Sequence, residues 1–299
     1  GTGGGVVERE GKWCAGPGRP GKESAWGAAR SRGGQGAATG GEIEIRKQKE
    51  IQESGTIIFR VSSIMLKKLF ARQPASAVSD SSPAPAAPGK RRVLLIGLDC
   101  LEPDLVFNRW LDDLPNLKSL YEHGLHGPLR SCDPPITVPA WSVMMSSKSP
   151  GMLGVYGFRN RADHSYDRYA IANSLAIKEE RLWEILTRAG KRSIVIGVPG
   201  TYPPKPLNGL MVTDFLTPDI TCEYTYPPAL KAEIEQVVGE YILDVRDFRS
   251  GNKAKILADI YEMTKKRFQL ARHLIQKEDW DYFMLVEMGT ERIHHALWD

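Results

Sequence analysis

Four polar side chains stand where the sequence changes from apolar to polar, and together their types suit phosphoryl chemistry. They are the hydroxyl of Thr137, the carboxylates of Asp99 and Glu291, and the imidazole of His295. A hydroxyl can act as a nucleophile, while carboxylate and imidazole groups are ligands of zinc and similar divalent ions. The first hypothesis is therefore a metal-assisted nucleophilic site, provided that the fold brings these residues together.

Thr137 stands at the expected start of a helix, at residue 137 or 138. The two prolines that precede it favour an extended approach, and Pro139 suits the first helical turn, where its missing N–H group costs nothing. The free N–H groups of that turn and the helix dipole would then stabilise an alkoxide or a phosphoryl oxygen beside Thr137. Threonine is also a common N-cap in such a position, and the alternative is that Thr137 only caps the helix.

Asp99 and Glu291 each come after an apolar segment that is typical of a strand buried on both faces. In open α/β sheets, ligands bind at the carboxyl ends of the strands. Glu291 and His295 are four positions apart, so both would face the same side of a helix and form half of a site for zinc or a similar ion. We therefore expect Asp99, Thr137, Glu291 and His295 to lie in one cleft.

Strands and helices alternate from Lys90 onward, which favours an α/β fold with a mostly parallel sheet and helices on both faces. The sequence shows no internal repeat. The predicted strands are residues 92–99, 193–199, 210–215 and 280–289, and the predicted helices lie within residues 103–123, 179–189, 226–239 and 254–277, in addition to the helix that starts at Thr137.

The N-terminal part differs from the rest, and the predicted domain boundary falls between residues 89 and 90. Residues 1–89 are rich in Gly, Ser and Pro and cannot bury enough apolar surface to offset chain entropy, so we expect a disordered segment that ends in a linker over residues 75–88. Met65 looks like a natural start, and the residues before it are expected to be upstream sequence read in frame. An arm that binds acidic partners is the alternative.

Composition excludes several classes of protein. The formal charge of +4 over 299 residues does not favour a nucleic-acid partner, and no apolar run reaches the roughly 18 residues of a membrane span. The four cysteines show no CxxC spacing and no disulfide framework, which favours a reducing compartment and a cytoplasmic location. Nothing in the sequence indicates the oligomeric state.

Four segments taken together resemble the alkaline phosphatase superfamily and, within it, the type I phosphodiesterase/nucleotide pyrophosphatase family: residues 96–99, 134–141, 149–158 and 289–298. The resemblance covers about residues 90–299 and implies the N-terminal part of an alkaline phosphatase-like catalytic domain. It further implies a metal-dependent hydrolase of a small-molecule phosphoester, with two divalent ions, Zn²⁺ or Mn²⁺. Carried over, Thr137 is the nucleophile and shares one metal with Asp99, while Glu291 and His295 hold the other.

Two departures from the family pattern bear on this expectation. Family members usually carry Asp where this chain has Glu291, and the family brings an Asp-His-Gly motif and a further histidine from sequence beyond position 299. We therefore expect the 299 residues to be an N-terminal fragment that is inactive alone. A noncatalytic α/β protein that binds a partner or a phosphorylated ligand is the alternative. A sulfatase is disfavoured, because Ile136 stands where the arginine of a Cys-x-Pro-x-Arg loop starting at Cys132 would be.

Overall fold

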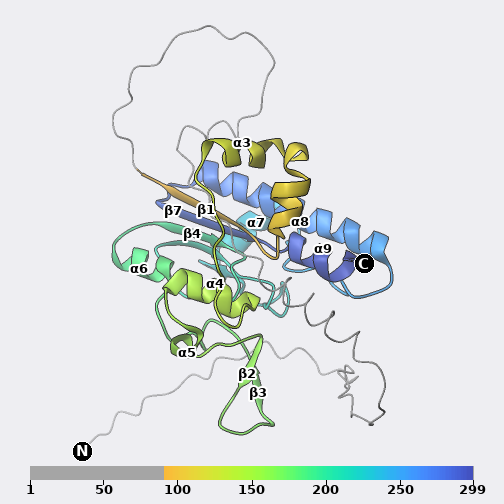
Figure 1. The fold of residues 1–299 in the computed structure, drawn as a ribbon. Coiled ribbons are helices and arrows are strands. Elements are labelled where there is room, and N and C mark those ends of the chain that lie inside the picture. The colour runs from red at the N-terminus through yellow and green to blue at the C-terminus, as the bar shows by residue number, and fades with distance from the viewer. Residues whose placement is uncertain (1–90, 299) are drawn as a thin grey trace, which may run out of the picture. The chain divides into compact units, whose positions relative to one another are not determined.

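The computed structural model describes residues 91–298. The predicted disordered segment of residues 1–89, its linker and the expected start at Met65 lie outside the described residues. From residue 91 onward, the chain alternates between strands and helices as expected (Figure 1).

The centre of the fold is a five-stranded sheet in the order β1-β7-β4-β5-β6 (Figure 1). Its first four strands run parallel to their neighbours, and only β6 pairs antiparallel, with β5. This arrangement confirms the predicted α/β class with a mostly parallel sheet. The strands are β1 (Val93–Leu98), β4 (Ser193–Ile196), β5 (Gly209–Val212), β6 (Thr225–Tyr226) and β7 (Tyr282–Glu287).

The described helices largely follow the predicted ranges. A separate hairpin of β2 (Arg159–Arg161) and β3 (Tyr169–Ile171) projects from the part of the chain after α5 (Figure 1). Among the described residues, none of the helices combines the length and the apolar character that crossing a membrane requires. The α-helices are α3 (Pro115–His123), α4 (Thr137–Ser146), α5 (Pro150–Leu153), α6 (Leu182–Arg188), α7 (Leu230–Val238), α8 (Lys253–Lys277) and α9 (Gly289–Leu297).

Two predicted helices begin later than expected, and proline explains both shifts. The range 103–123 divides into a π-helix (Asp104–Arg109), a 3-10 turn (Leu111–Asp113) and α3, which begins at Pro115. The range 226–239 begins with strand β6, and α7 follows only at Leu230. A proline disfavours helical backbone at the residue before it and cannot donate a helical hydrogen bond, so a helix begins after it or at it.

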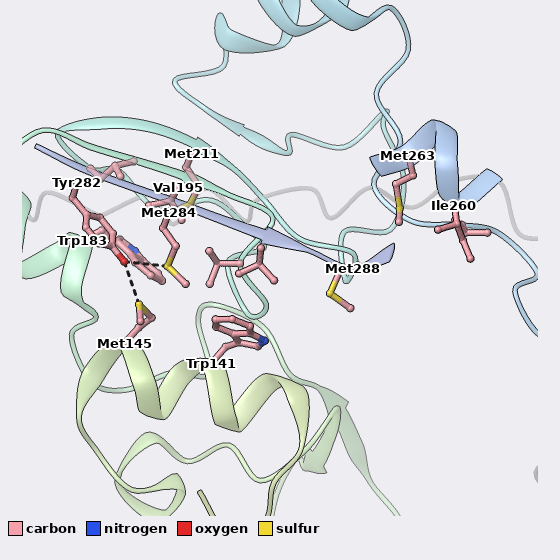
Figure 2. Packing of buried hydrophobic residues seen from close by; sticks show 14 of the residues in the cluster. Trp141, Met145, Trp183, Val195, Met211, Ile260, Met263, Tyr282, Met284 and Met288 are labelled. Carbon is pink, nitrogen blue, oxygen red and sulfur yellow. Dashed lines mark hydrogen bonds between the residues drawn. The ribbon is translucent and has the colours of Figure 1, made fainter. Parts of the chain in front are cut away.

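Helices cover both faces of the sheet. On one face, Trp141 and Met145 of α4 and Trp183 of α6 pack against the strands, as Figure 2 shows. On the other face, α7 and α8 contribute residues such as Ile234 and Leu270. The first cluster takes Val195, Met211, Tyr282, Met284 and Val286 from the strands, and the second takes Ile194, Ile196, Leu210, Val212, Phe283 and Leu285. This alternation follows from the period of two in a strand, and it makes the central strands apolar throughout.

Strand β1 differs from the prediction of a strand buried on both faces. It is the edge strand of the described sheet, and its Val93 and Ile96 side chains are 57% and 40% exposed. Every residue of its neighbour β7 is buried. An apolar run of six residues has the same composition at an edge and in the centre, so the sequence pattern could not distinguish the two positions.

Candidate active site

Asp99 lies at the carboxyl end of β1, directly beside the start of α9. The N–H group of Asp99 donates to the carbonyl of Glu287, the last residue of β7, at 3.0 Å. In return, the hydroxyl of Thr290 in α9 donates to the carbonyl of Asp99 at 2.6 Å. Because β1 and β7 are parallel neighbours, their carboxyl ends meet at one edge of the sheet, and the turn into α9 is fixed there.

The carboxyl group of Asp99 is buried, and only one of its oxygens has a partner. Oδ1 accepts a hydrogen bond from Nε1 of Trp141 at 3.2 Å, while Oδ2 has no hydrogen-bond partner in the described part of the chain. Burial, followed by the negative charge of Glu291, raises the pKa of this carboxyl to about 7, against the opposing effects of Trp141 and Arg292. Such a group is stabilised by binding either a proton or a metal cation.

Glu291 and His295 lie on the same side of α9, as the four-residue spacing predicted. Nε2 of His295 is 3.0 Å from Oε1 of Glu291. The Glu291 side chain is nearly buried, whereas the His295 side chain is 49% exposed. The charge of Glu291 acts on Asp99, so the structure brings the ends of β1 and β7 and the first turns of α9 into one acidic site.

Arg292 is a member of this site that the sequence did not reveal. Its Nη1 donates to Oε2 of Glu291, and its Nε and Nη2 donate to the two carboxylate oxygens of Asp244 at 2.6 and 2.8 Å. Burial lowers the pKa of Arg292, but the bonds to Asp244 and the charge of Glu291 outweigh it and raise the pKa above its usual value. The sequence contained only a general indication of this role, because an arginine next to a buried segment requires carboxylate partners.

Thr137 is the first residue of α4, which confirms the predicted start of that helix. The N-cap is Ile136, and no side chain caps the helix, so the structure does not support a capping role for Thr137. Trp141 lies four positions later, on the same face of α4, and its hydrogen bond to Asp99 holds this helix against the end of β1. The direct approach of the Thr137 hydroxyl to Asp99 and Glu291 stays a prediction.

The contact between α4 and β1 depends on a glycine. A Cβ atom at Gly97 would lie 2.2 Å from Cη2 of Trp141, so no larger residue fits beneath the indole ring. Gly97 thus allows Trp141 to cross β1 and to reach Asp99 two residues later. This requirement accounts for the glycine in the segment of residues 96–99.

Cys100, next to Asp99, and Cys132, in the segment before α4, are poor nucleophiles. Burial, then the charges of Asp99 and Glu291, raises the pKa of the Cys100 thiol. Burial also raises the pKa of Cys132, whose Sγ donates to the carbonyl of Pro134 at 3.2 Å. Neither thiol therefore forms a thiolate readily at neutral pH.

The residues of the site fit a divalent metal ion only in part. Between residues 91 and 298, no three or more His, Cys, Asp or Glu side chains are close enough together to hold a metal ion. The unpartnered oxygen of Asp99 and the Glu291–His295 pair are nevertheless ligand atoms of the types that Zn²⁺ and Mn²⁺ accept. The two-metal centre expected on Asp99, Thr137, Glu291 and His295 therefore stays a prediction.

The chain is similar to a known protein family. The family model described as type I phosphodiesterase/nucleotide pyrophosphatase matches residues 93–299, which include the whole described sheet and all four predicted site residues. No curated protein matches the chain.

Proposed function

Because the chain belongs to the type I phosphodiesterase/nucleotide pyrophosphatase family, we propose that it is a metal-dependent phosphoesterase whose nucleophile is Thr137. The buried, unpartnered Oδ2 of Asp99 is the observation that carries this proposal. A carboxylate beside a second carboxylate is unfavourable in a protein interior unless a cation joins it. A site that keeps this arrangement is suited to bind a divalent ion.

Four residues would hold the metal ions in this proposal. Asp99 and Thr137 would contribute to one ion, and Glu291 and His295 to the other. When bound, divalent ions of this kind neutralise phosphoryl oxygens and lower the pKa of a coordinated hydroxyl. The nearly buried setting of Asp99 and Glu291 excludes water from their carboxylates, which strengthens their interaction with a cation.

Thr137 would carry out the chemical step from the start of α4. Its Oγ1 attacks the phosphorus atom in line, loses its proton to solvent, and the bond to the leaving oxygen breaks, so that the leaving group departs with the electron pair. Water then hydrolyses the phosphothreonine and restores the hydroxyl. The N–H groups of the first turn of α4, next to Thr137, favour the negative charge that develops on the phosphoryl oxygens.

A second candidate function is phosphoester or phosphate binding without turnover. The contact of Arg292 with Glu291 favours it, because a guanidinium already occupies one oxygen of a proposed metal ligand. The two candidates differ in turnover, not in binding. An enzyme releases the leaving group repeatedly, whereas a binding protein retains the intact ester.

The test is hydrolysis of a chromogenic phosphodiester by protein expressed from the complete reading frame and loaded with Zn²⁺ or Mn²⁺. Thr137→Ala should lower kcat by several orders of magnitude, while metal affinity falls little because the carboxylates and His295 remain. Thr137→Ser should keep part of the activity. Thr221→Ala, at an exposed threonine, is the control and should behave as wild type. Wild-type turnover by Thr137→Ala would show that another group is the nucleophile.

A further inference from the structure

We propose that Arg292 is a positioning residue that orients Glu291 toward His295 for metal binding, and that Asp244 in turn holds Arg292. The inference rests on the proposed metal-dependent function. It assigns a role to two residues, Arg292 and Asp244, that are not themselves metal ligands. Its consequence is measurable as metal affinity, without any assay of turnover.

Asp244 anchors Arg292 independently of the metal site. The two residues form a fork with two parallel hydrogen bonds, from Nε to Oδ1 at 2.6 Å and from Nη2 to Oδ2 at 2.8 Å. This geometry fixes the plane of the guanidinium as well as its position. The third nitrogen, Nη1, is left pointing at Glu291.

Two aromatic rings fix the guanidinium further. The central carbon of Arg292 lies over the ring of Phe248, 4.3 Å from its centroid, and 5.2 Å from the centroid of Phe215. Phe248 also lies near the His295 ring, with 6.0 Å between centroids. Arg292 is therefore held by Asp244 and two rings whether or not Glu291 contacts it, and it can act as a fixed point for the Glu291 side chain.

The bond to Arg292 leaves the other oxygen of Glu291 facing His295. Oε2 is engaged by Arg292, and Oε1 is 3.0 Å from Nε2 of His295. Two ligand atoms that each lie about 2 Å from one zinc ion are about 3 Å apart. The separation of Oε1 and Nε2 thus suits one ion that both atoms would bind, with Glu291 contributing a single oxygen.

Charge alone makes the opposite prediction, so the two explanations can be separated. A guanidinium beside a cation site repels the cation, and removing it should strengthen metal binding. Loss of a hydrogen bond that orients a metal ligand instead weakens binding, typically by 10- to 100-fold. Asp244 carries one negative charge and Arg292 one positive charge, so removing both leaves the net charge of the site unchanged and tests positioning alone.

The experiment uses metal-free protein expressed from the complete reading frame and measures the Kd for Zn²⁺ and Mn²⁺ by competition with a chromogenic chelator. The double variant Asp244→Asn/Arg292→Met should bind about 10- to 100-fold more weakly than wild type. The matched control is Lys255→Met/Asp259→Asn, which removes an ion pair on the exposed side of α8, also without a change in net charge. It should leave the Kd unchanged.

Single variants and a fold check complete the design. Arg292→Lys keeps the charge but cannot bridge both carboxylates, and it should show an intermediate loss of metal affinity. If circular dichroism shows that the double variant is unfolded, the metal affinity of Arg292→Lys serves as the test. Unchanged or tighter binding by these variants overturns the positioning role. The proposed function has its own marker, Asp99→Asn, which should abolish binding of the ion that Asp99 and Thr137 would hold. If wild type binds metal and Asp99→Asn loses one of the two ions, then wild-type affinity in the Arg292 variants overturns only the positioning role. If wild-type protein binds no metal, both proposals fall.

Discussion

Replacing Asp99 by asparagine should stabilise the metal-free protein, by an amount that depends on pH. The carboxyl has a folded-state pKa of about 7, whereas that of an aspartate in water is 3.8. By linkage, this rise in pKa means that the ionised carboxylate destabilises the folded state by about 4 kcal/mol above pH 7. Asparagine has nearly the same shape, and its carbonyl can still accept the hydrogen bond of Trp141.

The stability gain from Asp99→Asn should rise with pH, because the folded-state pKa of this carboxyl is raised. Below about pH 4, a carboxyl whose folded-state pKa is raised is neutral in both the folded and the unfolded protein. As the pH rises toward 7, the unfolded protein ionises this carboxyl more readily than the folded protein does, so the folded state loses stability. The gain in free energy of unfolding from Asp99→Asn should therefore grow from about 1 kcal/mol at pH 4.5 to about 4 kcal/mol at pH 8. It is small at pH 4.5 because this pH is only slightly above the pKa of the carboxyl in the unfolded protein.

Urea unfolding in the presence of a chelator, at pH 4.5, 6 and 8, measures this difference as a free energy of unfolding. Excess Zn²⁺ at pH 8 should remove most of it, because a bound cation stabilises the carboxylate of wild type but not the amide. A stability difference that does not change with pH would refute the reasoning. So would a variant that is less stable than wild type at pH 8.

Two further predictions concern the packing around the site. Gly97→Ala should destabilise the fold by about 1–3 kcal/mol, because the new Cβ would lie 2.2 Å from the ring of Trp141; in urea unfolding, Gly127→Ala is the control, since no atom lies within 4 Å of its Cβ. Asp214→Asn should cost about 1–3 kcal/mol, because the buried carboxylate accepts four hydrogen bonds, three of them from backbone N–H groups, and an amide NH₂ group in place of one oxygen would oppose the donors on that side. An unchanged melting temperature would contradict the second prediction.

The elements that the sequence predicted well are those defined by local signals. Helix α4 begins where proline and the preceding extended segment indicated, and α8 differs from its predicted range by one residue at its start. Continuous apolar runs correctly predicted β4, β5 and β7. The edge position of β1 was not predictable in the same way, because it depends on pairing with β7, a strand 189 residues later in the chain.

In the candidate site, too, some features were predictable from the sequence and others depend on tertiary packing. The rule that ligands gather at strand ends predicted that Asp99 and Glu291 would lie near each other, because it needs only the order and direction of the strands. It could not predict the Asp244–Arg292 fork, whose partners are 48 positions apart and join a loop to a helix. Charge pairs of this kind are specified by tertiary packing and leave no periodic pattern in the sequence.

The site brings several negative charges together, and this lowers the stability of the folded protein. Asp99, Glu291 and Asp244 carry three negative charges when ionised, and Arg292 directly neutralises only one of them. Burial and then the charge of Glu291 raise the pKa of Asp99, and the opposing charge of Arg292 does not cancel these effects. The remaining negative charge favours the binding of divalent cations. A protein selected for stability alone would not keep a carboxylate at position 99, which is why the gain expected from Asp99→Asn bears directly on metal binding.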